Sequence, residues 1–245
     1  MTDESLPTRS DRSAAAKKNK QRSLKLFLRD LVIIFLVAIL VSFLIKTFVV
    51  RSFYIPSGSM ENTLQINDLI IVNELEPKLM PIHHGDVVVF TDPGGWLPAN
   101  MEKSDTNPIE WALSLVGLAA PDSDDHLVKR VIGLPGDKVS CCNALGQLSV
   151  NGSPLNEPYV KLPPGDSEAA AVHFSVTVPK GKLWVMGDNR HNSQDSSLNQ
   201  NLPGKGFVPE KDVVGRAIVI SWPISHWTWL SNYPDVFRGA EEESK

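Results

Sequence analysis

Two serines and three candidate bases are the residues of this sequence that could carry out nucleophilic chemistry. Ser57 and Ser59 lie in the turn-forming sequence PSGSM. A serine hydroxyl is a weak nucleophile until a neighbouring base removes its proton. The candidate bases are Lys129, which lies in an apolar, β-branched run, and His191, which Asp195 follows four residues later. These residue types allow either a Ser59–Lys129 dyad or a Ser59–His191–Asp195 triad.

Lys129 can serve as a base near neutral pH only if its pKa is unusually low. An unperturbed lysine has a pKa of about 10.4, which leaves only about 0.1% of it neutral near pH 7.4. Burial between apolar neighbours such as Leu127 and Val128 disfavours the ammonium form and can lower the pKa by about 2–3 pH units. We therefore expect Lys129 to titrate abnormally low if it is catalytic.

The composition argues against two other classes of function, nucleic-acid binding and metal- or cofactor-dependent chemistry. The 245 residues carry a formal net charge of −4, with a pI near 5.9, which argues against a general nucleic-acid binder. The two cysteines, Cys141 and Cys142, are adjacent, and a disulfide between neighbours closes a strained ring. We expect free thiols or contacts between chains. The sequence has no zinc-type spacing of Cys and His, so neither a metal nor an organic cofactor is predicted.

The first fifty residues predict a membrane anchor. Residues 1–25 are polar and are expected to be a disordered cytoplasmic tail, followed by a single transmembrane helix over 26–50. The uncharged run 31–45 gives only about 22 Å of helix, but extension to Val50, with the Lys46 ammonium snorkelling, reaches about 30 Å. Basic residues before the run place the N-terminus in the cytoplasm and the remaining chain outside the plasma membrane.

Two alternatives to an anchor fit less well. A cleaved signal peptide would have a shorter basic region and small residues at its cleavage site, whereas the bulky sequence RSFY follows the apolar run. An amphipathic helix in the membrane interface would have a polar face, and this run is apolar all round.

Residues 51–235 predict an extracytoplasmic, mostly antiparallel β domain that would carry the catalytic residues. Residues 138–150 indicate a hairpin, with its turn at 143–146. β-branched runs bounded by turn residues indicate further strands over 69–72, 86–90, 126–132, 174–178, 183–186 and 217–222.

Three other segments are less regular. Residues 91–125 are expected to form a loop or insertion around an apolar piece at 109–120, and 236–245 an acidic tail. The tryptophans between 222 and 229 suit either core packing or an interfacial aromatic patch, and we favour packing.

Four motifs occur in a recognisable order after the apolar segment. They are SGSM at 57–60, GDVVVF at 85–90, KRVIGLPGD at 129–137 and GDNRHNSQDS at 187–196. In this order they resemble the motifs of bacterial type I signal peptidases, and the resemblance covers about residues 30–222. It implies an antiparallel β catalytic domain on a single N-terminal anchor.

The resemblance assigns roles to individual residues. Ser59 would be the nucleophile that forms an acyl-enzyme, and Lys129 the general base of both half-reactions. Ser57 would donate its hydroxyl to the oxyanion, beside the backbone N–H of Ser59. Ser193 would orient the Lys129 amine.

A further ion pair is implied beside the dyad, and the sequence departs from the family pattern near it. Asp195 would pair with Arg130. Ser197, however, stands where an arginine is common, which removes one expected partner of Asp195, and His191 stands where an aspartate is common. Glu61 and its following asparagine replace an apolar residue and a proline.

The resemblance also implies how substrate binds. An extended peptide would lie beside the strand of Lys129 and present small side chains to shallow apolar pockets, at the positions one and three before the cleaved bond. The matching pocket residues are Phe53, Ile55, Leu64, Val89, Leu127 and Val128. The implied partners are exported preproteins with signal peptides and the lipid bilayer, without nucleic acid, and the sequence indicates no oligomeric state. Ser59 lies at most about 30 Å of chain beyond residue 50, so it would stay near the membrane face.

Two other functions use the same residues differently. A LexA-like repressor cleaves itself with serine and lysine, but no helix-turn-helix precedes the β domain here. A catalytically silent β domain could bind peptides at a sheet edge, and its function would survive Ser59→Ala. Within the peptidase hypothesis, a triad predicts loss of activity near pH 6–7 and sensitivity to His191, whereas a dyad predicts an alkaline optimum.

Overall fold

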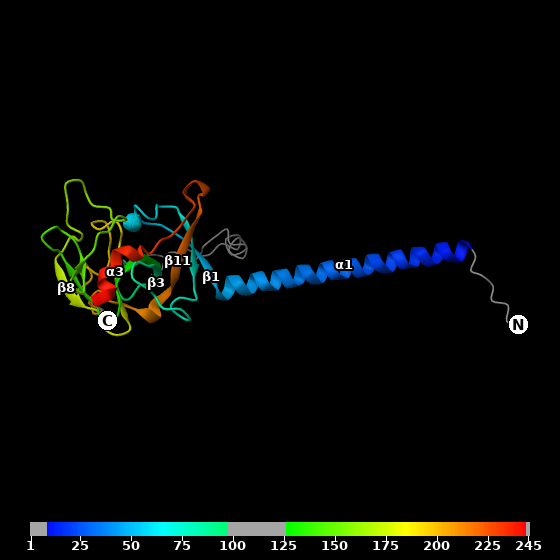
Figure 1. Cartoon of the computed structure of the whole chain (residues 1–245), viewed down its shortest axis with the longest axis horizontal. Helices are drawn as coiled ribbons and strands as arrows, with labels where there is room; N and C mark the ends of the chain where they lie inside the picture. The colour runs from blue at the N-terminus through cyan, green and yellow to red at the C-terminus, as the bar shows by residue number, and fades with distance from the viewer. Residues whose placement is uncertain (1–8, 98–125, 244–245) are drawn as a thin grey trace. The chain divides into compact units, whose positions relative to one another are not determined.

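The computed structural model describes residues 9–97 and 126–243, and the chain divides into two units at residue 48. The first unit contains helix α1 (Arg9–Phe48), which is drawn in blue in Figure 1. Its segment Lys25–Phe43 has a mean hydropathy of 2.6 and is long and apolar enough to cross a membrane. The expected disordered tail is wrong for residues 9–25, because the alanines, lysines and arginines there favour helix.

The second unit is built around an eight-stranded antiparallel sheet. In spatial order its strands are β1 (Val50–Tyr54), β2 (Leu69–Asn73), β11 (Val213–Trp222), β3 (Val87–Thr91), β4 (His126–Gly133), β9 (Lys182–Met186) and β10 (Val208–Pro209), and β12 (Thr228–Trp229) pairs with β11. Because Val50 already pairs with Asn73 in β1, helix α1 ends two residues before the end of the predicted transmembrane segment.

A smaller sheet packs beside it and carries the C-terminal helix. Its strands are β7 (Ser153–Pro154), β6 (Ser149–Val150), β5 (Lys138–Cys141) and β8 (Phe174–Thr177), in that order. Short 3-10 turns, η1 (Gly58–Met60), η2 (Glu210–Asp212) and η3 (Ile224–His226), complete the unit. The predicted strands and hairpin all form, and the mostly β, antiparallel fold is confirmed. The apolar piece at 109–120 lies outside the described residues.

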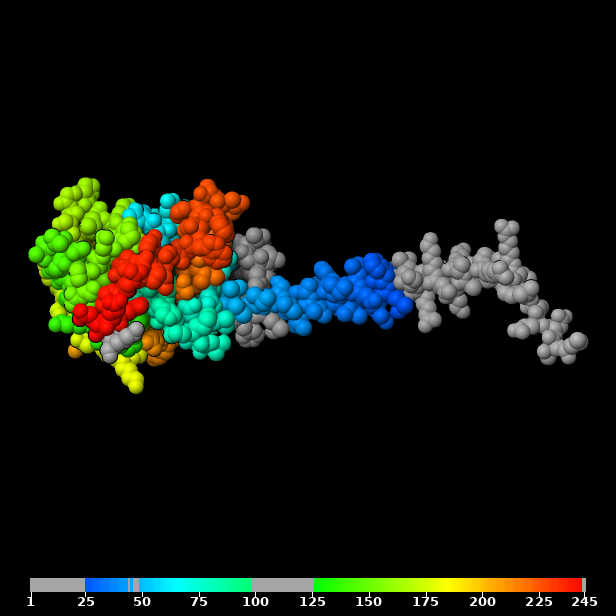
Figure 2. Space-filling model, in the orientation of Figure 1, coloured from blue at the N-terminus to red at the C-terminus, as the bar shows by residue number. Residues whose placement is uncertain are grey.

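The acidic C-terminal segment is a helix rather than a tail. Helix α3 (Pro234–Glu243) buries Phe237 and Ala240 in the core beneath the smaller sheet. In Figure 2 the C-terminal residues, drawn in red, lie on the surface of the second unit beside residues drawn in green. Phe237 and Ala240 are three positions apart and so lie on one face of a helix, while the glutamates that follow point to solvent.

The C-terminal tryptophans are exposed, so the favoured prediction of core packing is wrong. Trp222, Trp227 and Trp229 expose 56%, 54% and 65% of their surface, and Ile224 between them exposes 74%. Trp222 ends β11, Ile224 lies in η3, Trp227 follows η3 and Trp229 ends β12. None of them belongs to a core cluster, and Leu230 is the one residue of 222–230 that does.

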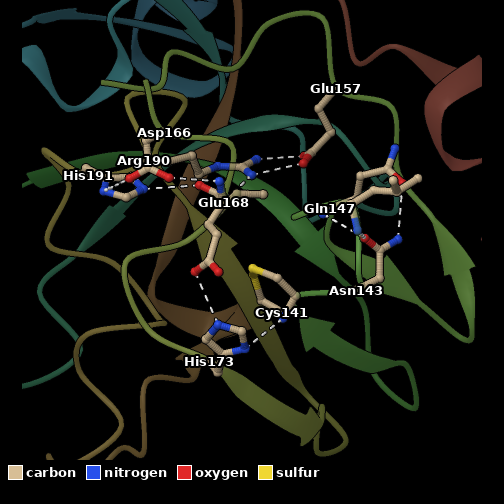
Figure 3. The surroundings of a disulfide bond; sticks show 12 residues. Cys141, Asn143, Gln147, Glu157, Asp166, Glu168, His173, Arg190 and His191 are labelled. Atoms are coloured by element: carbon tan, nitrogen blue, oxygen red, sulfur yellow. Dashed lines mark hydrogen bonds and ion pairs between the residues drawn. A yellow bond between two sulfur atoms is a disulfide. The ribbon is translucent and has the colours of Figure 1, made fainter. Parts of the chain in front are cut away.

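The two cysteines form a disulfide with each other, so the prediction of free or intermolecular thiols is wrong. Cys141, labelled in Figure 3, is the last residue of β5, and Cys142 follows it. Cys141 is buried in the core, where a second chain cannot reach it, and its sequence neighbour is the thiol within reach.

Candidate active site

Ser59 lies in the turn η1, which connects β1 to the next part of the large sheet. The turn is closed by a hydrogen bond from the Glu61 amide to the Gly58 carbonyl. Ser59 is buried, and its own carbonyl accepts a hydrogen bond of 3.1 Å from the amide of Asn189. The serine is therefore held from two sides, by its own turn and by the loop that follows β9.

Lys129 reaches Ser59 from the middle of β4. Its Nζ lies 2.8 Å from Ser59 Oγ and 3.0 Å from the carbonyl oxygen of Val128. Only 2% of the lysine is exposed, and this burial lowers its pKa to about 8, although the carboxylates of Asp195 and Asp188 act in the opposite direction. A neutral amine at this distance can accept the proton of the serine hydroxyl.

Ser57 lies next to the nucleophile. Its hydroxyl donates to Ser59 Oγ at 3.4 Å, and the residue as a whole is exposed. A donor at this position is within reach of an oxygen bound near Ser59, although its oxyanion role stays a prediction.

A mostly apolar pocket opens beside the two residues. It is lined by Phe53, Ile55, Leu127 and Val128, together with Ser59 and Lys129 themselves. Four of the six predicted pocket residues therefore line a pocket beside Ser59, and their contact with substrate stays a prediction. Leu64 and Val89 do not line this pocket, and both are fully buried in a core cluster to which Phe53 and Ile55 also belong.

The strand of Lys129 has a free edge next to Ser59. On one side β4 pairs with β3 along its first half, with Val88 opposite Lys129. On the other side β9 pairs only with Arg130 and the residues after it. Among the described residues no strand covers that side of 127–129, so an extended peptide can add to the sheet there.

The expected ion pair between Arg130 and Asp195 does not form. Arg130 pairs with Asp188 instead. Its Nε and Nη2 donate to the two carboxylate oxygens at 2.9 and 2.7 Å, and neither side chain is exposed. The Arg130 guanidinium also lies 4.0 Å over the Tyr159 ring. The sequence does not say which aspartate of the loop turns toward Arg130, because that depends on the path of an irregular segment.

The loop also contains a second buried ion pair that sequence reasoning missed. Arg190 donates to both carboxylate oxygens of Glu157, at 2.9 and 2.6 Å, and to the carbonyls of Gly187 and Ala169. Its only signal in the sequence is its place in the motif GDNR. The two arginines fix the loop that contacts Ser59.

Over residues 28–222 the sequence matches a family described as signal peptidase, peptidase S26. The chain belongs to this family. It is 38% identical over 236 residues to a signal peptidase I of Mycobacterium tuberculosis (strain CDC 1551 / Oshkosh), a match that covers 88% of this chain and 80% of that protein. It is 37% identical over 207 residues to the probable signal peptidase I-2 of Synechocystis sp., covering 84% and 78% of the two chains.

A solved structure gives a more distant match. The crystal structure of a signal peptidase I from Enterococcus faecalis V583 aligns with a TM-score of 0.36 at 23% identity, over 56% of this chain and 96% of that one. The family assignment rests on the sequence matches, which make this chain a serine-type signal peptidase.

Within this signal peptidase, Asp195 has a different partner from the expected arginine. Its Oδ1 accepts hydrogen bonds from the Ser197 amide and hydroxyl at 3.0 and 2.7 Å, and its Oδ2 accepts one from the Gly187 amide at 3.0 Å. Ser197 therefore supplies hydrogen-bond donors to the Asp195 carboxylate in place of the arginine that is common in the family.

Ser193 does not hydrogen-bond to Lys129, contrary to expectation. Its hydroxyl is buried and has no hydrogen-bond partner among the described residues. It packs against Gly187, where a Cβ atom would lie 2.3 Å from Ser193 Oγ and 2.5 Å from the Ser59 carbonyl oxygen. The close approach of this glycine lets the loop press against the nucleophile.

The triad alternative is not assembled. His191 Nε2 lies 3.1 Å from the Glu168 carbonyl oxygen, and His191 Nδ1 lies 3.5 Å from the Asp166 carboxylate (Figure 3). Asp195 bonds to backbone and Ser197 instead. Of the three candidate bases, only Lys129 contacts Ser59.

Proposed function

We propose that this protein is a membrane-anchored serine endopeptidase that removes signal peptides from exported preproteins, with Ser59 as nucleophile and Lys129 as general base. The observation that carries the proposal is the 2.8 Å contact between Lys129 Nζ and Ser59 Oγ in a buried site. With a pKa of about 8, about a fifth of Lys129 is neutral at pH 7.4. This is a usable population of base.

In the acylation step, neutral Lys129 takes the proton of Ser59 as Oγ attacks the scissile carbonyl carbon. The negative charge on the carbonyl oxygen is stabilised by the Ser57 hydroxyl and the Ser59 backbone N–H, and such a donor is typically worth about 2.7–4 kcal/mol. The Lys129 ammonium then returns the proton to the leaving amine, and the C–N bond breaks. The signal peptide remains as an ester on Ser59.

In the deacylation step, Lys129 is neutral again and acts on water. It removes a proton from the water that attacks the ester carbon, and the ammonium then protonates Ser59 Oγ as the C–O bond breaks. The signal peptide leaves with a new carboxylate, and the dyad returns to its starting state.

Substrate selection rests on the free edge of β4 and the adjoining pocket. A peptide that pairs with residues 127–129 alternates its side chains, so every second one faces the wall formed by Phe53, Ile55 and Val128. A shallow apolar wall favours small side chains, as at the positions one and three before a signal-peptide cleavage site.

The bilayer contacts of the enzyme follow from α1 and from the exposed tryptophans. The segment Lys25–Phe43 would span the membrane with the basic N-terminal residues in the cytoplasm. The exposed aromatic patch, defined as Trp222, Ile224, Trp227 and Trp229, is of the composition found at membrane–water interfaces. Contact of this patch with lipid would hold the catalytic unit against the membrane face.

The proposal is tested by cleavage of a preprotein with an Ala-x-Ala site by the detergent-solubilised chain, with the new N-terminus sequenced. We expect cleavage after the second alanine, loss of activity in Ser59→Ala and Lys129→Met, and full activity in His191→Gln. Lys138→Met, which changes an exposed lysine of β5, is the matched control. Activity that survives Lys129→Met would refute the dyad, and a wild type that binds but never cleaves would favour a silent peptide-binding domain.

A further inference from the structure

A second cluster of chemically active side chains lies outside the Ser59–Lys129 site, at the end of the smaller sheet. Cys142, Glu168 and His173 present a sulfur, a carboxylate oxygen and a ring nitrogen that all lie within 4.8 Å of one another. We propose that, once the disulfide is reduced, these residues bind a thiophilic divalent cation of the Zn²⁺ class.

The strand register brings the donors together. Strands β5 and β8 pair with Cys141 opposite Phe174, so the next residues outward, Cys142 and His173, face each other. The Cys142 amide donates a 3.3 Å hydrogen bond to His173 Nδ1, and His173 Nε2 lies 3.2 Å from Glu168 Oε2, a contact drawn in Figure 3. Glu168 and His173 come from the one segment that leads into β8, whereas Cys142 follows the end of β5.

The donor set and its dimensions suit zinc. Zinc takes thiolate sulfur, imidazole nitrogen and carboxylate oxygen at about 2.0–2.3 Å, so ligand atoms of a tetrahedral site lie about 3.3–3.6 Å apart. The 3.2 Å between His173 Nε2 and Glu168 Oε2 is close to this spacing. The His173 side chain is 64% exposed and the Glu168 side chain 46% exposed, so a cation from solvent can reach both. Water would fill the fourth position.

Cys142 rather than Cys141 is the sulfur ligand. Cys141 is 6% exposed and is part of the core, whereas Cys142 lies half-buried beside His173. A single thiolate is therefore expected in the site.

The disulfide controls whether that thiolate exists. A dithiol reductant would break the Cys141–Cys142 sulfur–sulfur bond, giving two electrons and two protons to the two sulfurs and becoming a disulfide itself. The cation then displaces the remaining proton of the Cys142 thiol. The neutral His173 ring binds through Nε2, its proton moves to Nδ1, and the hydrogen bond from the Cys142 amide is given up.

The experiment is a calorimetric titration of the full-length chain in detergent with Zn²⁺. The chain is titrated once oxidised and once after reduction by a water-soluble phosphine, which takes its oxygen from water. We expect one site in the reduced chain and at least about 100-fold weaker binding in the oxidised chain. Removing a residue that only hydrogen-bonds to a metal ligand typically lowers metal affinity about 10–100-fold, and loss of a ligand itself should cost more. Co²⁺ in place of Zn²⁺ should give a sulfur-to-metal charge-transfer band with the intensity of one thiolate.

Matched variants separate this site from adventitious binding. Cys141→Ser leaves Cys142 as a free thiol and should bind Zn²⁺ without reductant, whereas Cys142→Ser should bind weakly in either state. His173→Gln should also weaken binding, while His83→Gln, which changes an equally exposed histidine, should not. Equal binding by the oxidised and reduced chains, or undiminished binding by Cys142→Ser, would overturn the proposal.

Discussion

Arg130 and Asp188 form a two-point ion pair that joins strand β4 to the loop following β9, and neither side chain is exposed. Arg130 directly follows Lys129, and Asp188 directly precedes Asn189, whose amide bonds to the Ser59 carbonyl. The pair therefore connects the strand that carries the base to the loop that holds the nucleophile.

Asp188→Asn should strongly destabilise the folded unit. The substitution leaves the Arg130 charge buried and uncompensated, and removal of one partner from a buried pair costs about 3–5 kcal/mol. The free energy of unfolding is measured by denaturant titration followed by tryptophan fluorescence. Asp235→Asn, which breaks the exposed pair of Asp235 with Arg238, is the control and should change it little. Similar losses in both variants would contradict this account of Arg130.

Activity should rise with pH through the titration of Lys129. The base works only when neutral, and burial lowers its pKa to about 8. The logarithm of kcat/KM should therefore increase with a slope of one below pH 8 and level off above it. The profile of His191→Gln should be the same as that of the wild type. An inflection near pH 10, or one near pH 6–7 that disappears in His191→Gln, would rule out Lys129 as the base.

Lys129→Met should abolish activity but stabilise the fold at neutral pH. The folded-state pKa of about 8 lies below the ordinary value of 10.5, so below pH 8 the folded state carries the full penalty of a buried ammonium. That difference corresponds to about 3 kcal/mol. Between pH 8 and 10.5 the unfolded chain binds more protons, so wild-type stability rises with pH. The advantage of Lys129→Met in denaturant unfolding should shrink over this window, and a constant difference from pH 6 to 11 would contradict the burial argument.

The sequence predicts the strands and the meeting of Ser59 with Lys129, but not the partners within the loop. The strands follow from β-branched runs, and the dyad follows from a resemblance whose motifs occur in order. Which of Asp188 and Asp195 turns toward Arg130 depends on the path of an irregular loop, which has no periodicity to read. The same holds for Ser197, which replaces an expected arginine yet satisfies Asp195 with two hydrogen bonds.

The sequence also does not predict which apolar residues near the C-terminus are buried. Trp222, Trp227 and Trp229 suggest core packing because tryptophan is large, yet no element of the described structure covers them. Phe237 lies only a few residues before three glutamates and is fully buried, because helix α3 turns it toward the smaller sheet. Size and local composition do not fix burial when a segment lies at the margin of the core.

Gly187→Ala should impair catalysis far more than folding. The added methyl group would overlap the Ser59 carbonyl oxygen at 2.5 Å and must push the nucleophile or its loop aside. A displacement of about 1 Å at a reacting group can cost about 100-fold in rate, so we expect kcat to fall by this order. Gly204→Ala is the control, because its added methyl group meets only an ordinary contact of 3.6 Å. Unchanged kcat in Gly187→Ala would show that the loop does not position Ser59.

The exposed aromatic patch should contact lipid in the reconstituted enzyme. Tryptophans at a membrane interface are quenched by lipids brominated near the head of the acyl chain, whereas core tryptophans are not. In a background with Trp111→Phe, the wild type should be quenched, and replacement of Trp227 and Trp229 by serine should remove most of the effect. Trp96→Phe, which removes a buried ring, should leave quenching intact.

The serine variants should also cleave a soluble peptide as fast as the wild type and a membrane-inserted preprotein more slowly, since the patch acts by holding the active site at the bilayer rather than by shaping it. Quenching that is unchanged by both serine substitutions would assign the patch to another partner.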